Sequence, residues 1–422
     1  MSNHTRDRED AMTTSTTRRT DDIDFTDPDL LERGLPLAEF AERRATAPVW
    51  WNPQSIGPAF FDDEGFWVIS RHADIRAISK DTTTWSNREK GALMRFPEYA
   101  SREQIEGSRA FLLNMDPPEH TRMRKIVSRM FTPRAVSSLE ERLAAEAREI
   151  VAAAAEKGAG NFVEDVAIHL PLRAILDLLG VPAADRGYLC DLADAMTNGE
   201  DPDIKYDPFT ANVELLAYAF DMADDRRAHP RDDLVTTLVQ ADIDGHALSD
   251  IEFGFFVMLL VIAGNETTRN AITHGVNAFL DHPAQWELFR RDRPVTAVDE
   301  IIRWATPVHC FQRTAMTDTE VGGVAITTGQ RVGLFYSSAN YDETVFDDPF
   351  TFDITRDPNP HLSFGGNGAH FCIGANLARL EVNLMFNTLA DLVPDMAKLA
   401  EPRRVRSGWL HGVKELRVSY SG

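Results

Sequence analysis

The sequence predicts a mainly α-helical protein with a small β portion, folded as a single domain. Segments rich in helix formers dominate the chain, whereas β-branched runs bounded by glycine stand out at residues 65–70 and 314–338. The apolar share of 43% is ample for a sizeable core, and no linker or repeat interrupts the 422 residues. We therefore expect one domain over residues 23–422, preceded by a disordered polar tail over residues 1–22.

Four segments show helix signals most clearly. Residues 138–158 combine strong helix formers with a terminal glycine, Gly158. Residues 249–283 predict one long helix that Ser249 caps and that ends near Pro283. Residues 294–307 predict another helix, and the residues that follow Cys372 have a helical pattern too. Residues 91–113, in contrast, favour a long loop.

Charge and cysteine content limit the functions open to this chain. The 66 acidic and 44 basic residues give a formal net charge of −22, which disfavours binding to nucleic acid. The N-terminal residues lack an apolar core of signal-peptide length, and the longest apolar run, residues 253–264, is shorter than the roughly 20 residues that span a bilayer. Three dispersed cysteines, Cys190, Cys310 and Cys372, exclude a disulfide framework. We therefore expect a soluble, cytoplasmic protein without a membrane span.

The most informative stretch surrounds Cys372, where a glycine-rich run gives way to a helical one. Gly365, Gly366 and Gly368 allow unusual backbone angles and a close approach to a flat ligand. The start of the following helix favours a thiolate. A lone cysteine is most often structural, His370 stands too near in sequence for a good nucleophile pair, and zinc needs more ligands than this segment offers. One thiolate on a large planar metal complex, haem, fits best.

The long helix contains a polar break, Ala263 to Thr268, within an otherwise apolar pattern. Gly264 costs helix stability, about 1 kcal/mol relative to alanine. The Thr267 hydroxyl can bond back to a carbonyl one turn earlier and bend the helix. Together with Glu266 it would line a groove that admits O2 and water. The alternative is a polar patch at a contact between helices.

Other charged residues are less specific when taken singly. Glu300 and Arg303 stand at i, i+3, a spacing that by itself usually means a surface ion pair worth about 0.2–0.5 kcal/mol. His120 and Arg124 stand four residues apart on an expected helix, and Arg313 lies further along the chain. Each of these basic residues alone is ordinarily a solvated side chain.

Residues 361–381 resemble the haem-binding loop of the cytochrome P-450 family, a Phe-Gly-rich segment followed by His-x-Cys-x-Gly. The matching residues are Phe364, His370, Cys372 and Gly374, with Phe364 eight residues before the cysteine. The usual family spacing is one residue shorter. The resemblance implies the family's α-rich triangular-prism fold and haem b, iron protoporphyrin IX, with Cys372 as axial iron ligand and Phe364 beside the haem.

The same resemblance extends to the other motifs, in the family's order along the chain. Gly264, Glu266 and Thr267 match the family's oxygen-activation site, in which the acid and the alcohol relay protons. Glu300 and Arg303 match its buried Glu-x-x-Arg pair, with Arg356 as the expected third member of a structural network. The contacts expected for the haem propionates are His120, Arg124, Arg313 and His370.

Within the family, residues 23–420 resemble the actinobacterial steroid C26-monooxygenases, and the longer Phe–Cys spacing is similar to theirs and to that of relatives acting on methyl-branched lipids. This implies hydroxylation of the terminal methyl (C26/C27) of a sterol side chain such as that of cholesterol or cholest-4-en-3-one, in steroid catabolism, with further oxidation to the aldehyde and acid open. The alternative is an omega-hydroxylase of methyl-branched fatty acids or other terpenoid lipids. Candidates to line an apolar tunnel, for which core packing is at least as good an explanation, are Leu93, Phe96, Ile262 and Trp409.

The resemblance also implies partners. The monooxygenase reaction needs O2 and two electrons, and no G-x-G-x-x-G nucleotide-binding fingerprint follows a predicted strand in this sequence. We therefore expect a separate ferredoxin and an NAD(P)H-dependent ferredoxin reductase as electron donors to a monomeric enzyme. A haem-binding sensor or carrier is the alternative from another class, and the intact Glu266–Thr267 pair argues against it.

Overall fold

The computed structural model describes residues 23–54, 61, 63–96, 102–231, 233–243 and 246–421. The polar tail expected over residues 1–22 lies outside these residues. The description that follows concerns the described part of the chain.

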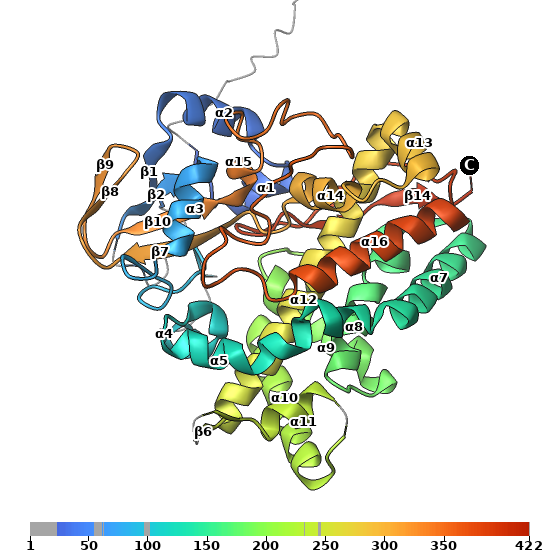
Figure 1. Ribbon diagram of the computed structural model, residues 1–422, viewed down its shortest axis with the longest axis horizontal. Helices are drawn as coiled ribbons and strands as arrows, with labels where there is room; N and C mark the ends of the chain where they lie inside the picture. Colours follow the sequence, from blue (N-terminus) through green and yellow to red (C-terminus); the bar gives the residue numbers. More distant parts are fainter. Residues whose placement is uncertain are drawn as a thin grey trace, which may run out of the picture.

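Helices make up most of the structure, which confirms the predicted mainly α class (Figure 1). The longer helices are α2 (Leu37–Thr46), α3 (His72–Lys80), α5 (Glu119–Ser128), α7 (Glu140–Lys157), α8 (His169–Leu178), α9 (Arg186–Asn198), α10 (Pro208–Ala228), α12 (Asp250–Asp281), α13 (Pro283–Asp292), α14 (Ala297–Ala305) and α16 (Ala375–Leu392). The short ones are α1 (Pro28–Glu32), α4 (Arg102–Gly107), α6 (Pro133–Ser137), α11 (Leu234–Val239) and α15 (Tyr336–Ala339).

The β portion is small and centres on one mixed sheet in the order β1-β2-β10-β7-β3. Strand β2 pairs antiparallel with β1 and parallel with β10, and β7 pairs antiparallel with β10 and β3. These strands are β1 (Val49–Pro53), β2 (Gly65–Ile69), β3 (Trp85–Ser86), β7 (Cys310–Ala315) and β10 (Arg331–Phe335). The remaining strands are β4 (Ala159–Asn161), β5 (Asp242–Ile243), β6 (His246–Ala247), β8 (Thr319–Val321), β9 (Val324–Ile326), β11 (Ala397–Lys398), β12 (Arg403–Arg404), β13 (Val413–Glu415) and β14 (Arg417–Ser419).

Helix α12 runs through the middle of the molecule and packs against α8, α9, α10, α14 and α16 (Figure 1). Its start is fixed by a capping box, in which the Ser249 hydroxyl accepts from the backbone N–H of Glu252 while the Glu252 carboxylate accepts from that of Ser249. The helix ends at Asp281, two residues before Pro283. Its predicted existence and both predicted ends are confirmed.

The same helix corrects one step of the sequence analysis. The expectation of no membrane span relied on a short apolar run, yet α12 is long and apolar enough to cross a membrane by length and composition, the one such helix among the described residues. About half of its most apolar window, 56%, is buried inside the protein. Core helices of water-soluble proteins meet the same criterion, and the packing of α12 is that of a core helix.

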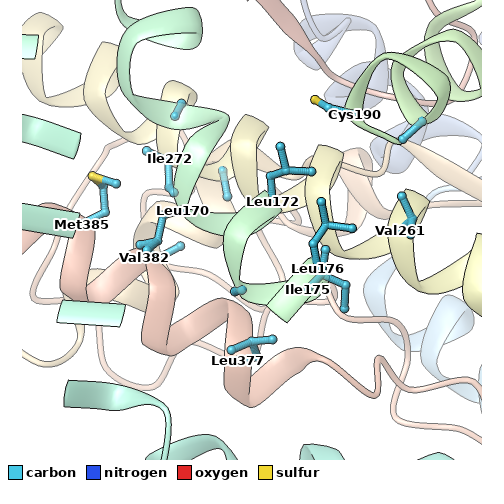
Figure 2. Close-up of a cluster of buried hydrophobic side chains, with 14 of the residues drawn as sticks. Leu170, Leu172, Ile175, Leu176, Cys190, Val261, Ile272, Leu377, Val382 and Met385 are labelled. Atoms are coloured by element: carbon cyan, nitrogen blue, oxygen red, sulfur yellow. The ribbon is translucent and has the colours of Figure 1, made fainter. Parts of the chain in front are cut away.

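Helix α8 packs against both α12 and α16, which also contact each other. Figure 2 shows Leu170, Leu172, Ile175 and Leu176 of α8 beside Val261 and Ile272 of α12, with Leu377, Val382 and Met385 of α16 on the other side. All nine side chains belong to the largest hydrophobic cluster. This packing fixes α12 relative to the segment that carries Cys372, because α16 begins three residues after that cysteine.

Most of the expected elements are confirmed. Helix α7 ends at Gly158, whose φ of +74° suits the left-handed region that glycine tolerates. The two β regions contain β2 and the strands β8, β9 and β10. The expected long loop over residues 91–113 is in part wrong: α4 and two single 3-10 turns, Ser108–Ala110 and Leu112–Asn114, occupy its second half, and residues 97–101 lie outside the described residues.

Candidate functional site

A cavity of about 290 Å³ lies between α12 and the segment that precedes α16. Its walls come from α5, α8, α12, the start of α16, the loop over residues 363–374, strand β7 and the C-terminal segment around Trp409. The Cys372 side chain lies inside the protein but is open to this cavity, whereas Cys190 and Cys310 are closed off in the core. The cavity is therefore where the chain presents a thiol.

The loop that carries Cys372 is held by its own backbone. The Cys372 N–H donates to the carbonyl of Phe364 over 2.9 Å, and the Gly365 N–H donates to that of Leu362 over 2.8 Å. Gly365 has a φ of +91° and Asn367 one of +61°, so two residues of the loop occupy the left-handed region. These bonds close the longer Phe–Cys segment into a compact turn that holds the thiol at the cavity wall.

Gly366 and Gly368 are required for a reason that differs from the predicted one. A Cβ added to Gly366 or Gly368 would overlap the side chain or the backbone of Ser79, at the end of α3. Both residues also line the cavity. The absence of side chains at Gly366 and Gly368 therefore lets the loop pack closely against α3. It also leaves room on the side of the loop that lines the cavity.

Helix α16 begins with Gly374 as N-cap, two residues beyond Cys372. Burial raises the pKa of the Cys372 thiol, while a backbone hydrogen bond from Gly374 and the charges of Arg124 and Arg379 lower it. The start of the helix therefore favours the thiolate, as expected, but burial favours the protonated thiol. Because a coordinated thiol is deprotonated outright, a bound metal would decide its state.

On α12, the polar break predicted at residues 263–268 faces the cavity. The Thr267 hydroxyl donates to the Ala263 carbonyl over 2.8 Å, as expected for a threonine that bonds back one turn. A Cβ added to Gly264 would lie 3.1 Å from Ile175 on α8. Gly264 therefore lets α8 approach α12 closely, while Thr267 offers its oxygen lone pairs to the cavity.

Glu266 is buried and forms an ion pair with Arg269, one turn further along α12. Arg269 also pairs with Asp194 of α9 over 2.8 Å, and Asn270 donates to the Glu266 carboxylate over 2.9 Å. Burial raises the pKa of the Glu266 carboxyl against the opposing charge of Arg269. Asp194 and Arg269 border a second cavity of about 140 Å³. The carboxyl thus stands between two cavities.

Four basic residues gather at one end of the main cavity. His120, Arg124, Arg313 and His370 all line it, and the rings of the two histidines lie 4.1 Å apart. Burial and the nearby charge of Arg124 lower the pKa of His120 to about 4, and burial with Arg313 lowers that of His370 to about 2. Both imidazoles are therefore neutral near pH 7.

The polar atoms of this basic cluster are only partly satisfied. The Nε2 atoms of His120 and His370 are buried without a hydrogen-bond partner among the described residues. Arg313 is 5% exposed and its guanidinium donates to the Gln312 carbonyl over 2.6 Å, while Arg124 donates to the Phe371 carbonyl. No salt bridge in the described part of the chain involves either arginine. Buried cations and unpartnered imidazole nitrogens of this kind need polar partners, and the carboxylates of a haem would supply them.

Behind the Cys372 loop lies the network of Glu300, Arg303 and Arg356. Glu300 and Arg303 are fully buried, and the guanidinium of Arg303 donates to both Glu300 oxygens over 2.8 Å. Arg356 donates to the same carboxylate over 3.1 Å. Arg303 also donates to the carbonyl of Asn340, whose side chain bonds to Ser363 at the start of the loop. The network is continuous with the segment that carries Cys372.

The tunnel residues predicted from the sequence divide into two groups. Ile262 and Trp409 line the cavity, and the Trp409 ring lies over Phe311 with centroids 6.1 Å apart. Leu93 and Phe96 are not among the described residues that line it. Their segment is held at the sheet, where the Ala92 carbonyl accepts from Gln312, and the Phe96 ring packs against Phe61. The interpretation of these two as tunnel residues therefore stays a prediction, with core packing as its alternative.

Several lining residues escaped the sequence analysis. They are Phe256, Leu259, Val308, Phe311, Glu381 and Leu410. Phe256 and Leu259 could have been found, because they precede Ala263 and Thr267 at helical spacing on one face of α12. Val308 and Leu410 carry no local signal, since a single β-bridge brings them together across the chain.

Comparison with known proteins gives a consistent result. A family model described as Cytochrome P450 matches residues 295–390. A steroid C26-monooxygenase of Rhodococcus jostii is 57% identical over 94% of this chain and 84% of its own length. A methyl-branched lipid omega-hydroxylase of Mycobacterium tuberculosis is 40% identical over 90% of each chain. Among solved structures, a Mycobacterium marinum cytochrome P450 in complex with pseudoionone superposes with a TM-score of 0.89, at 37% identity, over 96% of this chain and 100% of that one.

Proposed function

Because this chain belongs to the cytochrome P450 family, whose members are haem-thiolate monooxygenases, we propose that it hydroxylates the terminal methyl (C26/C27) of a sterol side chain. The proposed substrates are cholesterol and cholest-4-en-3-one, and the alcohol formed can be oxidised further to the aldehyde and acid. The observation that carries the proposal is the 57% identity, over 94% of the chain, to a relative named steroid C26-monooxygenase. The reaction belongs to steroid catabolism.

The cofactor is cysteine-thiolate-ligated haem, which when bound activates O2 with two electrons. We assign Cys372 as its iron ligand, because this is the cysteine whose thiol reaches the cavity. His120, Arg124, Arg313 and His370 hold the propionates through the unsatisfied groups described above. Phe364 and Gly264 line the space between Cys372 and α12.

Thr267 and Glu266 handle protons in this assignment. The Thr267 hydroxyl already donates to Ala263, so its oxygen accepts a hydrogen bond from a group in the cavity. Glu266 lines this cavity, and its partner Arg269 lines the smaller one. When the ion pair with Arg269 loosens, Glu266 exchanges protons with water in the smaller cavity. The network of Glu300, Arg303 and Arg356 is structural. It supports the Cys372 loop from behind, within a single haem domain over residues 23–422.

Selecting a terminal methyl over weaker C–H bonds requires positioning. Phe256, Leu259, Ile262, Val308, Phe311 and Trp409 give the cavity an apolar wall opposite the Cys372 loop. An apolar wall of this kind suits a sterol, whose side chain would have to be directed toward Cys372. The wall accepts the tail of a methyl-branched fatty acid on the same physical grounds, and the 40% identical omega-hydroxylase supports that second substrate class.

The monooxygenase uses redox partners. We propose a ferredoxin and an NAD(P)H-dependent ferredoxin reductase, since the sequence carries no G-x-G-x-x-G fingerprint after a strand. The three cysteines are unpaired, which suits a reducing cytoplasm, and we expect the enzyme to act as a monomer.

Binding of a sterol is expected to change the absorbance of the haem-loaded protein. Cholest-4-en-3-one should shift the Soret band toward the high-spin position and saturate at micromolar concentration, because a sterol held against the apolar wall would exclude water from the haem side of the cavity. The measurement is an absorbance titration with a panel of sterols and methyl-branched fatty acids. A shift with the fatty acids and none with any sterol would replace the sterol assignment by the omega-hydroxylase one.

Thr267→Ala is expected to uncouple oxygen use from product formation. The amount of alcohol formed per NAD(P)H should fall by about tenfold or more, with hydrogen peroxide in its place, because the hydroxyl oxygen that accepts a hydrogen bond in the cavity and positions the proton relay is lost. Thr273→Ala is the matched control: Thr273 makes the same bond to the carbonyl one turn earlier, over 2.8 Å, but does not line the cavity. Equal coupling in both variants would refute the role of Thr267.

A further inference from the structure

Three side chains from different parts of the chain meet beside the Cys372 loop. Asp299 lies in the first turn of α14, Arg379 lies on α16, and His361 lies three residues before Phe364. The Arg379 Nε donates to one oxygen of the Asp299 carboxylate over 2.7 Å, and the His361 Nε2 donates to the same oxygen over 3.2 Å. We call these three residues the clasp, because they join α14, the segment before the loop and α16.

The hydrogen bonds of the clasp define its charges. The His361 Nδ1 accepts from the backbone N–H of Ser363 over 3.3 Å, so the ring proton is on Nε2 and the imidazole is neutral. Burial of this side chain lowers the pKa of His361, which agrees with a neutral ring. Burial raises the pKa of Asp299, but hydrogen bonds from His361 and Arg379 outweigh it and bring that pKa to about 2. The clasp therefore holds one cation, Arg379, and one anion, Asp299.

The cation of the clasp lies against the ring that borders the cavity. The guanidinium carbon of Arg379 is 4.6 Å from the centre of the Phe364 ring, and the His361 ring packs on the same phenyl group with centroids 5.6 Å apart. Phe364 lines the main cavity, and its carbonyl accepts the N–H of Cys372 over 2.9 Å. Because an apolar ring screens a charge less than water does, the field of Arg379 reaches the thiol side of the cavity.

We propose that the clasp sets the reduction potential of the haem held by Cys372, with Arg379 raising the potential and Asp299 lowering it. This inference rests on the proposed assignment of Cys372 as iron ligand and extends it to charged residues behind Phe364. The clasp acts through the electrostatic field and through the position of the Phe364 ring, so its members are positioning residues.

The step that the clasp affects is reduction of the bound haem by one electron. The electron comes from the redox partner, no bond of the clasp forms or breaks, and the net charge at the iron falls by one. A nearby cation stabilises the product of this step and a nearby carboxylate destabilises it. Because Arg379 and Asp299 form one ion pair, removing either charge should move the potential and removing both should largely restore it.

The first test is a reductive titration of the haem-loaded protein with a chemical reductant, without substrate or redox partner. In Arg379→Met the ratio of reduced to oxidised haem at a fixed applied potential should fall several-fold, and in Asp299→Asn it should rise. The double variant should return close to the original protein. A structural role alone has no reason to give shifts of opposite sign that cancel. Shifts of the same sign, or no shift in either single variant, would overturn the proposal.

Matched controls lie at the far end of the same helix. Asp391 is twelve residues beyond Arg379 on α16, about 18 Å along the axis, and pairs with Arg148 over 3.2 Å. Arg148→Met and Asp391→Asn should keep the original potential, and shifts as large as those at the clasp would overturn the proposal. Arg379→Lys keeps the charge but loses the planar group that lies on Phe364, so its potential should stay closer to the original than that of Arg379→Met.

Haem content and the spectrum of the reduced, carbon monoxide-bound protein are measured on each variant. If Arg379→Met does not hold haem, the Asp299→Asn and Arg379→Lys proteins still test the predicted signs. An Arg379→Met protein with the original potential that a ferredoxin reduces more slowly would show that Arg379 contacts the partner, and would overturn the proposal. Failure of the sterol assignment leaves this titration unaffected, whereas failure of the Cys372 assignment would appear as a thiolate-type spectrum in Cys372→Ser.

Discussion

Replacing Cys372 with serine is expected to abolish oxidation of any substrate. A serine hydroxyl stays protonated and cannot supply the thiolate that makes the iron reactive. Activity should fall by more than about a hundredfold, since loss of mere outer partners of a metal site already costs 10–100-fold. The measurement is product formation together with the absorbance spectrum of the reduced, carbon monoxide-bound protein, which reports the thiolate ligand.

The other two cysteines provide matched controls for this prediction. Cys190 and Cys310 are buried and neither lines the main cavity. Cys190→Ala and Cys310→Ala should therefore keep the thiolate-type spectrum and substantial activity, apart from a loss of stability from the vacated volume. A Cys372→Ser protein that retained the thiolate spectrum, or a Cys310→Ala protein that lost it, would show that the iron ligand has been assigned to the wrong cysteine.

Replacing Arg303 with methionine is expected to cost about 3–5 kcal/mol of unfolding free energy. The change leaves the fully buried Glu300 carboxylate with less cationic charge, and it frees the carbonyls of Asn340 and Pro349 that Arg303 now satisfies over 2.8 and 2.9 Å. Because Asn340 bonds to Ser363 at the start of the Cys372 loop, haem content should fall as well. Denaturant unfolding and the haem-to-protein ratio measure the two effects.

Arg173→Met is the matched control for the buried network. Arg173 donates to Glu149 over 3.2 Å, but the Glu149 side chain is 70% exposed, so the pair is worth about 0–1 kcal/mol. A loss of stability at Arg303 no larger than that at Arg173 would contradict the view that the network supports the haem loop. It would also show that the Glu300–Arg303 pair contributes no more to stability than an ordinary ion pair on a helix surface.

Those site residues were predictable whose reactive side chain stands at a visible change in the local sequence pattern. Cys372 stands between a glycine-rich loop and a helical segment, and Thr267 interrupts an apolar helix, so both were recognisable without any tertiary contact. Helix α12 was predictable in both ends because Ser249 and Pro283 are local signals. The loop glycines were recognised, but not the packing of Gly366 and Gly368 against Ser79 that requires them.

Leu93 and Phe96 show what local reasoning leaves open. Their segment is as apolar as a tunnel wall would be, but a hydrogen bond from the Gln312 N–H to the Ala92 carbonyl ties it to the sheet, and neither residue is among the described residues that line the cavity. Glu381 shows a different limit, because a glutamate in a helix pattern resembles a solvated side chain until α16 is packed against α12. In both cases the position of a side chain depends on elements distant in the sequence.

By itself the sequence determined the mainly α class, the principal helices and the residues with intrinsic chemistry, because capping, glycine, periodicity and a lone thiol act over a few residues. The tertiary structure alone decided which basic side chains are left unsatisfied around the cavity and which acid pairs with an arginine. It also decided that Glu381 is buried beside the hydroxyl of Thr268. The physical reason is that burial and charge pairing are sums over neighbours from the whole chain, which no local pattern contains.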